Sequence, residues 1–149
     1  MLFNDAEKYL EYIHQKLIDL NLLENSIIVI FSDHGMSLGE KFGERAYGAL
    51  CYDSTIRAFC LYYSTDLAHK EIISQVRSVD IMPTILDIAG ITIPRDIDGK
   101  SFAKVFNDNN EKVNNYVYGV ATKQNVRDAK IFPSRSIRDE QFKYIVNFN

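Results

Sequence analysis

Apolar and polar residues follow one another in blocks that predict helices and strands in turn. In residues 6–21, Leu10, Ile13, Leu17 and Leu20 recur at helical spacing, which predicts an amphipathic helix with one apolar face. Residues 27–31 are all apolar and three of them are isoleucine, which is typical of a strand covered on both faces. The order of these two blocks predicts a helix that packs on a sheet.

The remaining blocks continue the alternation of helix and strand. Ser78 or Asp80 is expected to cap a helix that runs to Ala89 and ends at Gly90. A short helix is predicted for residues 101–106. Strands are predicted at residues 57–63, 116–121 and 142–146, and a long loop at residues 35–48. This order predicts an α/β fold with helices on a largely parallel sheet.

Candidate chemistry lies directly after the apolar strand at residues 27–31. Asp33 and His34 follow the strand, and Gly35 is expected to let the chain turn sharply behind them. Ligands of open α/β sheets collect at the carboxyl ends of strands. A carboxylate and an imidazole together suit zinc, manganese or magnesium, and calcium where oxygens complete the shell. The alternative is a polar turn in which Asp33 accepts hydrogen bonds from nearby amides.

Composition and charge exclude several classes of function. The chain has 149 residues with 17 basic and 20 acidic side chains, and it has no basic run, so we expect no binding of nucleic acid. No apolar run approaches the 18 or so residues of a membrane span. The two cysteines indicate no cellular compartment, so localisation is left open.

Three later segments, taken in order, resemble stretches of the sulfatase family. Residues 79–91, with Pro94 and residues 98–102, are similar to one of them. Residues 47–57 resemble the family stretch His/Lys-Gly-x-x-x-Tyr-Glu-x-x-(Ile/Val)-Arg. Residues 136–145 resemble the segment that ends in Lys-Tyr and opens the family's small C-terminal antiparallel sheet. The chain thus resembles sulfatases of the alkaline-phosphatase-like superfamily.

This resemblance implies a fold, a metal and an incomplete catalytic apparatus. It implies part of a three-layer α/β/α sandwich over residues 1–122, and the start of the antiparallel subdomain over residues 123–149. It also implies a calcium site in which Asp33 and His34 join a pair of aspartates that this chain lacks. The family nucleophile, Cys or Ser in Cys/Ser-x-Pro-x-Arg, is absent too, because the one Pro-x-Arg here follows Ile131 at the nucleophile position.

The expected substrate pocket departs from the family pattern at one position. The family's basic residue, which contacts the sulfate, is replaced by Tyr47. Lys41 and Arg45 lie nearby in the chain and would restore positive charge around an ester, although both are equally explained as solvated loop charges. We therefore take Lys41, Arg45 and Tyr47 as candidate substrate-binding residues.

The sequence favours a metal-dependent hydrolase of sulfate esters, inactive as this 149-residue chain alone. A phosphomonoesterase, phosphodiesterase or phosphoethanolamine-type transferase of the same superfamily is the alternative enzyme. A metal-binding or interaction module without catalysis is the alternative outside enzymes. Because half of the predicted sheet would be missing, we expect the chain to expose apolar surface and to self-associate.

Overall fold

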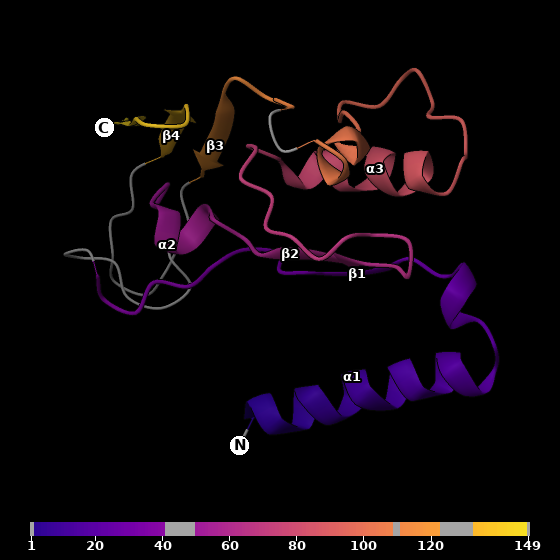
Figure 1. Ribbon diagram of the computed structural model, residues 1–149. Helices are drawn as coiled ribbons and strands as arrows, with labels where there is room; N and C mark the ends of the chain where they lie inside the picture. The colour runs from indigo at the N-terminus through magenta and orange to yellow at the C-terminus, as the bar shows by residue number, and fades with distance from the viewer. Residues whose placement is uncertain (1, 41–49, 109–110, 123–132, 149) are drawn as a thin grey trace. The chain divides into compact units, whose positions relative to one another are not determined.

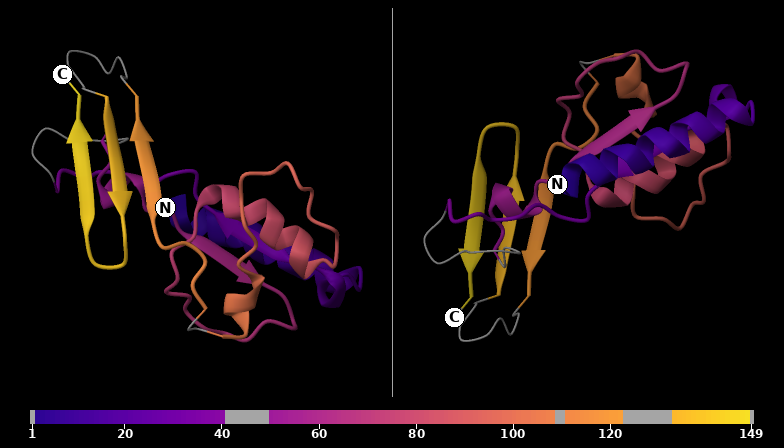
Figure 2. Two further views of the ribbon diagram at one scale, coloured as in Figure 1. Left: turned by 90° about the horizontal axis from the view of Figure 1, so that it is seen from above. Right: turned by 90° about the horizontal axis from the view of Figure 1, so that it is seen from below.

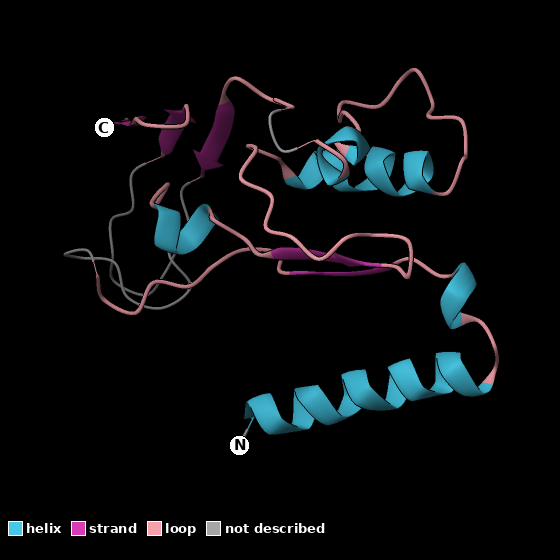
Figure 3. Cartoon of the chain, viewed as in Figure 1, coloured by secondary structure: helices cyan, strands magenta, loops and turns pink. Residues whose placement is uncertain are grey.

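The computed structural model of the protein describes residues 2–40, 50–108, 111–122 and 133–148. Helices and strands both occur, in the order α1, β1, α2, β2, α3, β3, β4 and β5 (Figures 1 and 3), which places the chain in the α/β class. The chain divides into two compact units, residues 1–30 with 61–69, and residues 31–60 with 70–149.

The first unit pairs a long helix with a short sheet. Helix α1 (Leu2–Asp19) matches the predicted helix, although it begins earlier. The predicted apolar run forms β1 (Ile28–Phe31), which pairs with β2 (Cys60–Tyr63) in a two-stranded sheet. The His14 ring meets the Tyr63 ring edge to face, with centroids 5.9 Å apart. Leu10, Ile13 and Leu20 of the predicted apolar face are 46%, 52% and 63% exposed, so the structure does not show the predicted packing of that face on the sheet.

The second unit contains an antiparallel sheet of three strands. These are β3 (Val117–Ala121), β4 (Ser134–Arg138) and β5 (Lys143–Asn147), and Figure 2 shows them side by side in the order β3-β4-β5. The sequence predicted the first and the last of them. Because β3 pairs in register with β4, the sheet includes residues before 122. The proposed division of the chain at that residue stays a prediction.

Helix α3 (Ile81–Ile88) ends as its sequence predicted. Gly90 has a φ of 69°, a left-handed conformation that favours glycine. The Gly90 amide donates to Asp87 O at 3.0 Å and the Ile91 amide donates to Leu86 O at 2.8 Å. This pair of bonds is the Schellman arrangement, and it satisfies the carbonyls that a helix end leaves without partners.

The beginning of α3 differs from the prediction, because Asp80 is the N-cap residue of α3 but makes no side-chain capping bond there. Asp80 is fully buried. Its carboxylate accepts hydrogen bonds from the guanidinium and the amide of Arg77, from the Lys100 amide at 2.9 Å and from Asn114 Nδ2 at 2.9 Å. The side chain therefore caps the short 3-10 turn η2 (Ser78–Asp80) and holds two distant loops to it.

The core beside α3 is small and partly polar. The predicted short helix is the 3-10 turn η3 (Ala103–Phe106), and Phe102 and Val105 are buried there. Thr84 Oγ1 donates to Asp80 O at 2.6 Å and accepts from the Phe102 amide at 3.0 Å. Hydrogen bonds to side chains thus join η3 to α3. None of the helices in the described part of the chain has the length and apolar character needed to cross a bilayer.

Candidate functional site

The turn after β1 carries the candidate metal ligands on its exposed side. The Asp33 side chain is 85% exposed and the His34 side chain 41% exposed. Asp33 Oδ1 accepts a hydrogen bond from the His34 amide at 2.8 Å, and Asp33 Oδ2 lies 3.5 Å from His34 Nε2. One carboxylate oxygen thus accepts a hydrogen bond from a local amide, as the alternative of a polar turn predicted. The other oxygen faces the imidazole.

The imidazole of His34 is oriented by the backbone of its own turn. His34 Nδ1 lies 2.6 Å from Gly35 O. Because a carbonyl oxygen only accepts hydrogen bonds, Nδ1 must carry the proton, which leaves the lone pair of the neutral ring on Nε2. A backbone carbonyl behind a histidine is a common way to fix the ligand tautomer at metal sites.

The two atoms that face each other suit a shared cation. A carboxylate oxygen and an imidazole lone pair would repel each other at this distance unless a proton or a metal ion lay between them. Metal ions sit about 2.0 to 2.6 Å from such ligands, so atoms 3.5 Å apart reach one ion together. The described residues contain no cluster of three or more His, Cys, Asp or Glu side chains of this kind. Asp33 and His34 therefore fit as two ligands of a larger set.

The turn at residues 32–35 is held by hydrogen bonds to residues 55–59. The Gly35 amide donates to Thr55 O at 2.6 Å, the Ser32 amide donates to Phe59 O at 3.1 Å, and the Phe59 amide donates to Ser32 Oγ at 3.1 Å. Thr55 belongs to the one-turn helix α2 (Asp53–Ile56), which the sequence did not predict. Three hydrogen bonds thus fix residues 32–35 on residues 55–59.

Gly35 is required here for a reason other than the predicted one. Among the described glycines, only Gly39 and Gly90 have a positive φ, so Gly35 does not supply a left-handed turn. A Cβ added at Gly35 would instead lie 2.3 Å from Ser54 O. The missing side chain permits close packing of the turn on α2.

A cluster of three charged residues supports α2, and the sequence analysis missed its role. Asp53 Oδ2 accepts a hydrogen bond from Arg138 Nη1, and Asp53 Oδ1 accepts one from Lys143 Nζ at 2.7 Å. Partial burial alone raises the pKa of Asp53, but the bonds from Lys143 and Arg138 outweigh it, and the pKa lies below its usual range. The sequence signal that could have indicated this contact is the opposite charge of Asp53 and of Arg138 and Lys143, which lie in two segments that resemble the sulfatase family.

The candidate substrate-binding residues are not placed. Lys41, Arg45 and Tyr47 all fall outside the described ranges, so their expected contact with an ester stays a prediction. The adjacent Glu40 accepts a hydrogen bond from the Leu38 amide at 2.7 Å. Backbone hydrogen bonds of this kind hold the pKa of Glu40 below its usual range. Residues 38–40 therefore form a local turn before the described residues end.

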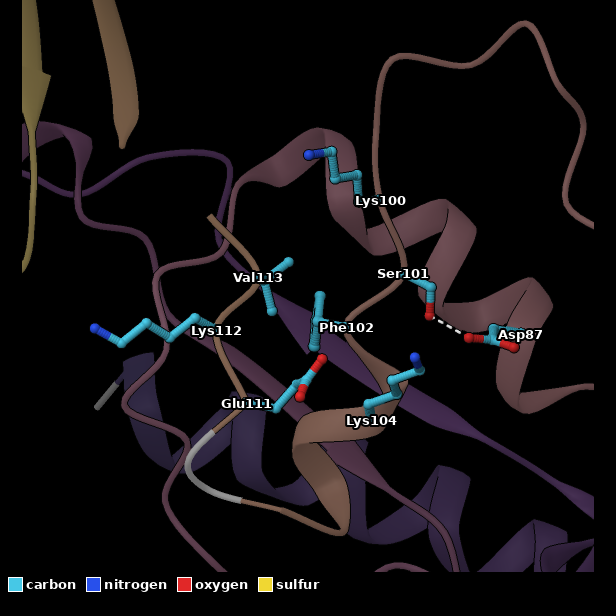
Figure 4. Close-up of a pocket in the computed structure, with 8 residues that line it drawn as sticks. All are labelled: Asp87, Lys100, Ser101, Phe102, Lys104, Glu111, Lys112 and Val113. Carbon is cyan, nitrogen blue, oxygen red and sulfur yellow. Dashed lines mark hydrogen bonds between the residues drawn. The ribbon is translucent and has the colours of Figure 1, made fainter. Parts of the chain in front are cut away.

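A surface hollow lies elsewhere in the same unit, beside α3 and η3. It encloses about 230 Å³, and Lys100, Lys104 and Lys112 line it together with Asp87 and Glu111. In Figure 4 Ser101 donates a hydrogen bond to Asp87, and Lys112 points away from the hollow. Lys112 Nζ lies 2.8 Å from Glu140 Oε1. The charges of this hollow largely cancel, so the turn after β1 is the better candidate site.

Comparison with known proteins identifies the family. Residues 48–149 match the family model described as N-sulphoglucosamine sulphohydrolase, C-terminal. An ulvan-active sulfatase from Formosa agariphila is 38% identical over 135 residues, which are 90% of this chain and 26% of that protein. An extracellular sulfatase SULF-1 homolog from Drosophila melanogaster is 30% identical over 104 residues, 69% of this chain and 9% of that protein.

Solved structures agree. BT4656, solved in complex with its substrate D-glucosamine-2-N,6-O-disulfate, superposes with a TM-score of 0.74 at 26% identity, covering 93% of this chain and 28% of that one. BT1596, a 2-O GAG sulfatase, shares the fold with a TM-score of 0.67 at 23% identity, over 82% of this chain and 27% of that one. The fold is thus part of the alkaline-phosphatase-like α/β fold. The chain spans about a quarter of the length of the Formosa sulfatase and of BT4656, and it belongs to the sulfatase family, whose C-terminal region it matches.

Proposed function

We propose that this chain is the C-terminal part of the catalytic domain of a sulfatase, and that it supplies Asp33 and His34 to a divalent metal ion. The observation that carries the proposal is the 3.5 Å approach of Asp33 Oδ2 to His34 Nε2 in an exposed turn of a sulfatase-family chain. Calcium is the ion that the family resemblance implies, with manganese, magnesium and zinc as the other candidates. Such an ion polarises ester oxygens and holds the nucleophile close to them.

The proposed reaction is hydrolysis of a sulfate ester on a carbohydrate. BT4656 was solved with a sulfated glucosamine as its substrate, and the Formosa relative is named for its activity on ulvan. The nucleophile and the other metal ligands would come from the rest of a longer protein. On this account the 149-residue chain alone supplies two ligands of the metal shell and performs no turnover.

The segment that follows residues 32–35, the proposed metal turn, is proposed to contact the ester. Tyr47 replaces the basic residue of the family pattern, so it brings a hydroxyl donor but no charge. Hydrogen bonds to charged partners contribute about 1.5 to 3 kcal/mol where neutral ones contribute about 1. Lys41 or Arg45 would supply the missing charge to the sulfate.

The test is steady-state kinetics of the full-length enzyme on paired aryl sulfate and aryl phosphate substrates. Asp33→Ala and Lys41→Ala should each lower kcat/KM for the sulfate ester at least about tenfold, which is ~1.4 kcal/mol of transition-state stabilisation. Asp87→Ala is the matched control, because Asp87 is an exposed carboxylate on α3. Equal rates for the Asp33 variant and its parent, or faster turnover of the phosphate ester, would contradict the proposal.

Self-association is the second part of the proposal, and the sheet of the second unit supports it. Tyr118, Val120 and Tyr144 are exposed large apolar residues of β3 and β5. Tyr118 and Tyr144 both pair with Ile137 and therefore share one face. We propose that a second copy of the chain covers this face.

Sedimentation should show dimers or larger species at about 10 µM, a usual range for transient interfaces, and Tyr118→Ser with Tyr144→Ser should shift them toward monomer. A monomer at that concentration would refute this part.

A further inference from the structure

The inference starts from the carboxylate of Asp53, which two cations from the C-terminal sheet hold at once. Arg138 Nη1 of β4 donates to Asp53 Oδ2, and Lys143 Nζ of β5 donates to Asp53 Oδ1. Arg138 and Lys143 are direct partners across the two strands, so the sheet presents them as a pair. We call these three residues the Asp53 clamp.

The clamp differs from an ordinary surface ion pair in burial and in connectivity. The side chains of Lys143, Arg138 and Asp53 are 15%, 34% and 43% exposed, whereas the Lys112 and Glu140 side chains of a nearby pair are 63% and 57% exposed. Exposed pairs contribute little because water screens them and their long side chains lose freedom. The clamp engages both oxygens of one carboxylate from two strands, so it restrains the position of α2 and not only a side chain.

Asp53 is the first residue of α2, and α2 supports the turn at residues 32–35. Asp53 O accepts from the Arg57 amide at 3.0 Å within this single helical turn, and Thr55 O accepts from the Gly35 amide at 2.6 Å. The Gly35 carbonyl then orients His34 through Nδ1 at 2.6 Å. A path of hydrogen bonds and short backbone links therefore leads from β4 and β5 through α2 to the imidazole.

The packing of this path leaves the turn little freedom to move independently of α2. Ser54 O lies so close to Gly35 that a Cβ there would be only 2.3 Å away. On its other side, the segment around α2 packs on the sheet, because Cys51 is buried and Ser134 Oγ donates to Cys51 Sγ at 3.5 Å. A shift of α2 would consequently move Gly35 and the ring of His34.

We propose that Asp53, Arg138 and Lys143 are positioning residues, which hold α2 against the C-terminal sheet and thereby fix the Asp33-His34 turn in its ligand geometry. The inference deepens the proposed function and rests on it for the identity of the bound ion. The positioning itself is a property of the metal-free chain.

The first readout needs no metal and compares two backbone amides in the 149-residue chain. Asp53→Asn should speed hydrogen exchange of the Gly35 amide about fivefold or more, the lower end of typical coupling between sites. The Phe102 amide, which donates to Thr84 Oγ1 in the same unit, should keep its exchange rate. Arg138→Gln and Lys143→Met, which each remove one of the two bonds, should show smaller effects in the same direction.

The second readout is the affinity for calcium and manganese, measured by titration of the same variants. Asp53→Asn should weaken binding about fivefold, whereas Asp53→Glu should restore it, because it keeps a carboxylate for Arg138 and Lys143. Glu140→Gln is the matched control, since it removes an exposed ion pair near the same sheet, and it should change neither readout.

The outcomes separate the two proposals. Unchanged Gly35 exchange in Asp53→Asn would overturn the positioning role, and so would Gly35 and Phe102 exchanging faster by the same factor, since the clamp would then stabilise only the unit as a whole. If the parent chain bound neither ion, the metal assignment of Asp33 and His34 would fail. A selective change at Gly35 would in that case still support the clamp.

Discussion

Asp33 and Asp80 are the same residue type in the same compact unit, yet the structure places them in opposite environments. The Asp33 side chain is 85% exposed and accepts one local amide. Asp80 is fully buried, and Arg77, Asn114 and the Lys100 amide surround its carboxylate. The first carboxylate has an oxygen turned toward His34, while both oxygens of the second already accept hydrogen bonds within the protein.

This contrast separates a proposed metal ligand from a structural carboxylate. A buried carboxylate whose oxygens both accept several hydrogen bonds cannot take up an ion without breaking them. An exposed one beside an oriented imidazole can bind an ion and release it. Asp53 is intermediate, because it is partly exposed and held by two cations. The three residues thus predict three different responses to substitution.

The largest expected effect is on stability, at Asp80. Asp80→Ala removes the acceptor of five hydrogen bonds and leaves Arg77 without its partner in the buried network. Loss of one member of a buried ion pair costs about 3 to 5 kcal/mol, so the variant should unfold at much lower urea concentration. Asp87→Ala on the same helix is the control and should cost less than about 1 kcal/mol. Similar losses for both variants would contradict the contrast.

A second effect is the dependence of stability on pH. Burial raises the pKa of Asp80, but the bonds from Arg77, Lys100 and Asn114 outweigh it and hold the pKa below its usual range. An unfolded aspartate binds protons near pH 4, so the unfolded chain then binds more protons than the folded one. The contribution of Asp80 is therefore present above about pH 4 and is lost as the pH falls through the lowered pKa.

Urea unfolding at pH 7 and pH 3 measures this effect. The parent should lose more stability between the two pH values than Asp80→Asn, because the amide does not titrate. Asp53 is expected to add a smaller part in the same direction, since its pKa is also lowered and its side chain is partly exposed. Parallel losses in the parent and in Asp80→Asn would show that Asp80 does not carry the pH dependence.

The next effect in size concerns the packing of the metal turn on α2. Gly35→Ala would bring a methyl group to 2.3 Å from Ser54 O. Overpacking of this kind costs about 1 to 3 kcal/mol, and here it should also displace His34 and weaken metal binding. Gly39→Ala is not a neutral control, because Gly39 has a φ of 103°. Met36→Ala, at an exposed position in the same loop, is suitable and should change neither stability nor affinity.

The sequence predicted elements well and contacts between distant residues poorly. The apolar run at β1, the helix that ends at Gly90 and the strands β3 and β5 followed from local periodicity, because each is a local property of the chain. Asp80 was expected only to cap the helix, because its partners Lys100 and Asn114 lie 20 and 34 residues further on and leave no local pattern. Helix α2 was missed because four residues are too short for a periodic pattern.

The candidate site was predicted in part. Asp33 and His34 could be identified because they follow an apolar strand, and the structure places them together. The support of this turn could not be predicted, because Asp53 lies 85 positions from Arg138 and 90 positions from Lys143 in the sequence. The need for glycine at position 35 was predicted for the wrong reason, because a close backbone approach leaves no signature in the sequence.

The smallest effect on stability is expected at Asp33 and His34, where substitution should have the largest effect on metal binding. Asp33→Ala and His34→Ala remove exposed side chains, so each should change the free energy of unfolding by less than about 0.5 kcal/mol. Thermal or urea unfolding of the metal-free variants checks this. A loss as large as that of Asp80→Ala would mean that the turn is structural and that the contrast between the two carboxylates is wrong.

The most direct test of the central claim is a titration of the chain with calcium and manganese, followed by NMR at the His34 ring. We predict weak binding, with a dissociation constant of about 1 mM, because two protein ligands leave most of the shell to water. Binding should disappear in Asp33→Ala and His34→Ala but not in Asp87→Ala. Equal affinity in the parent and in the two turn variants would contradict the account.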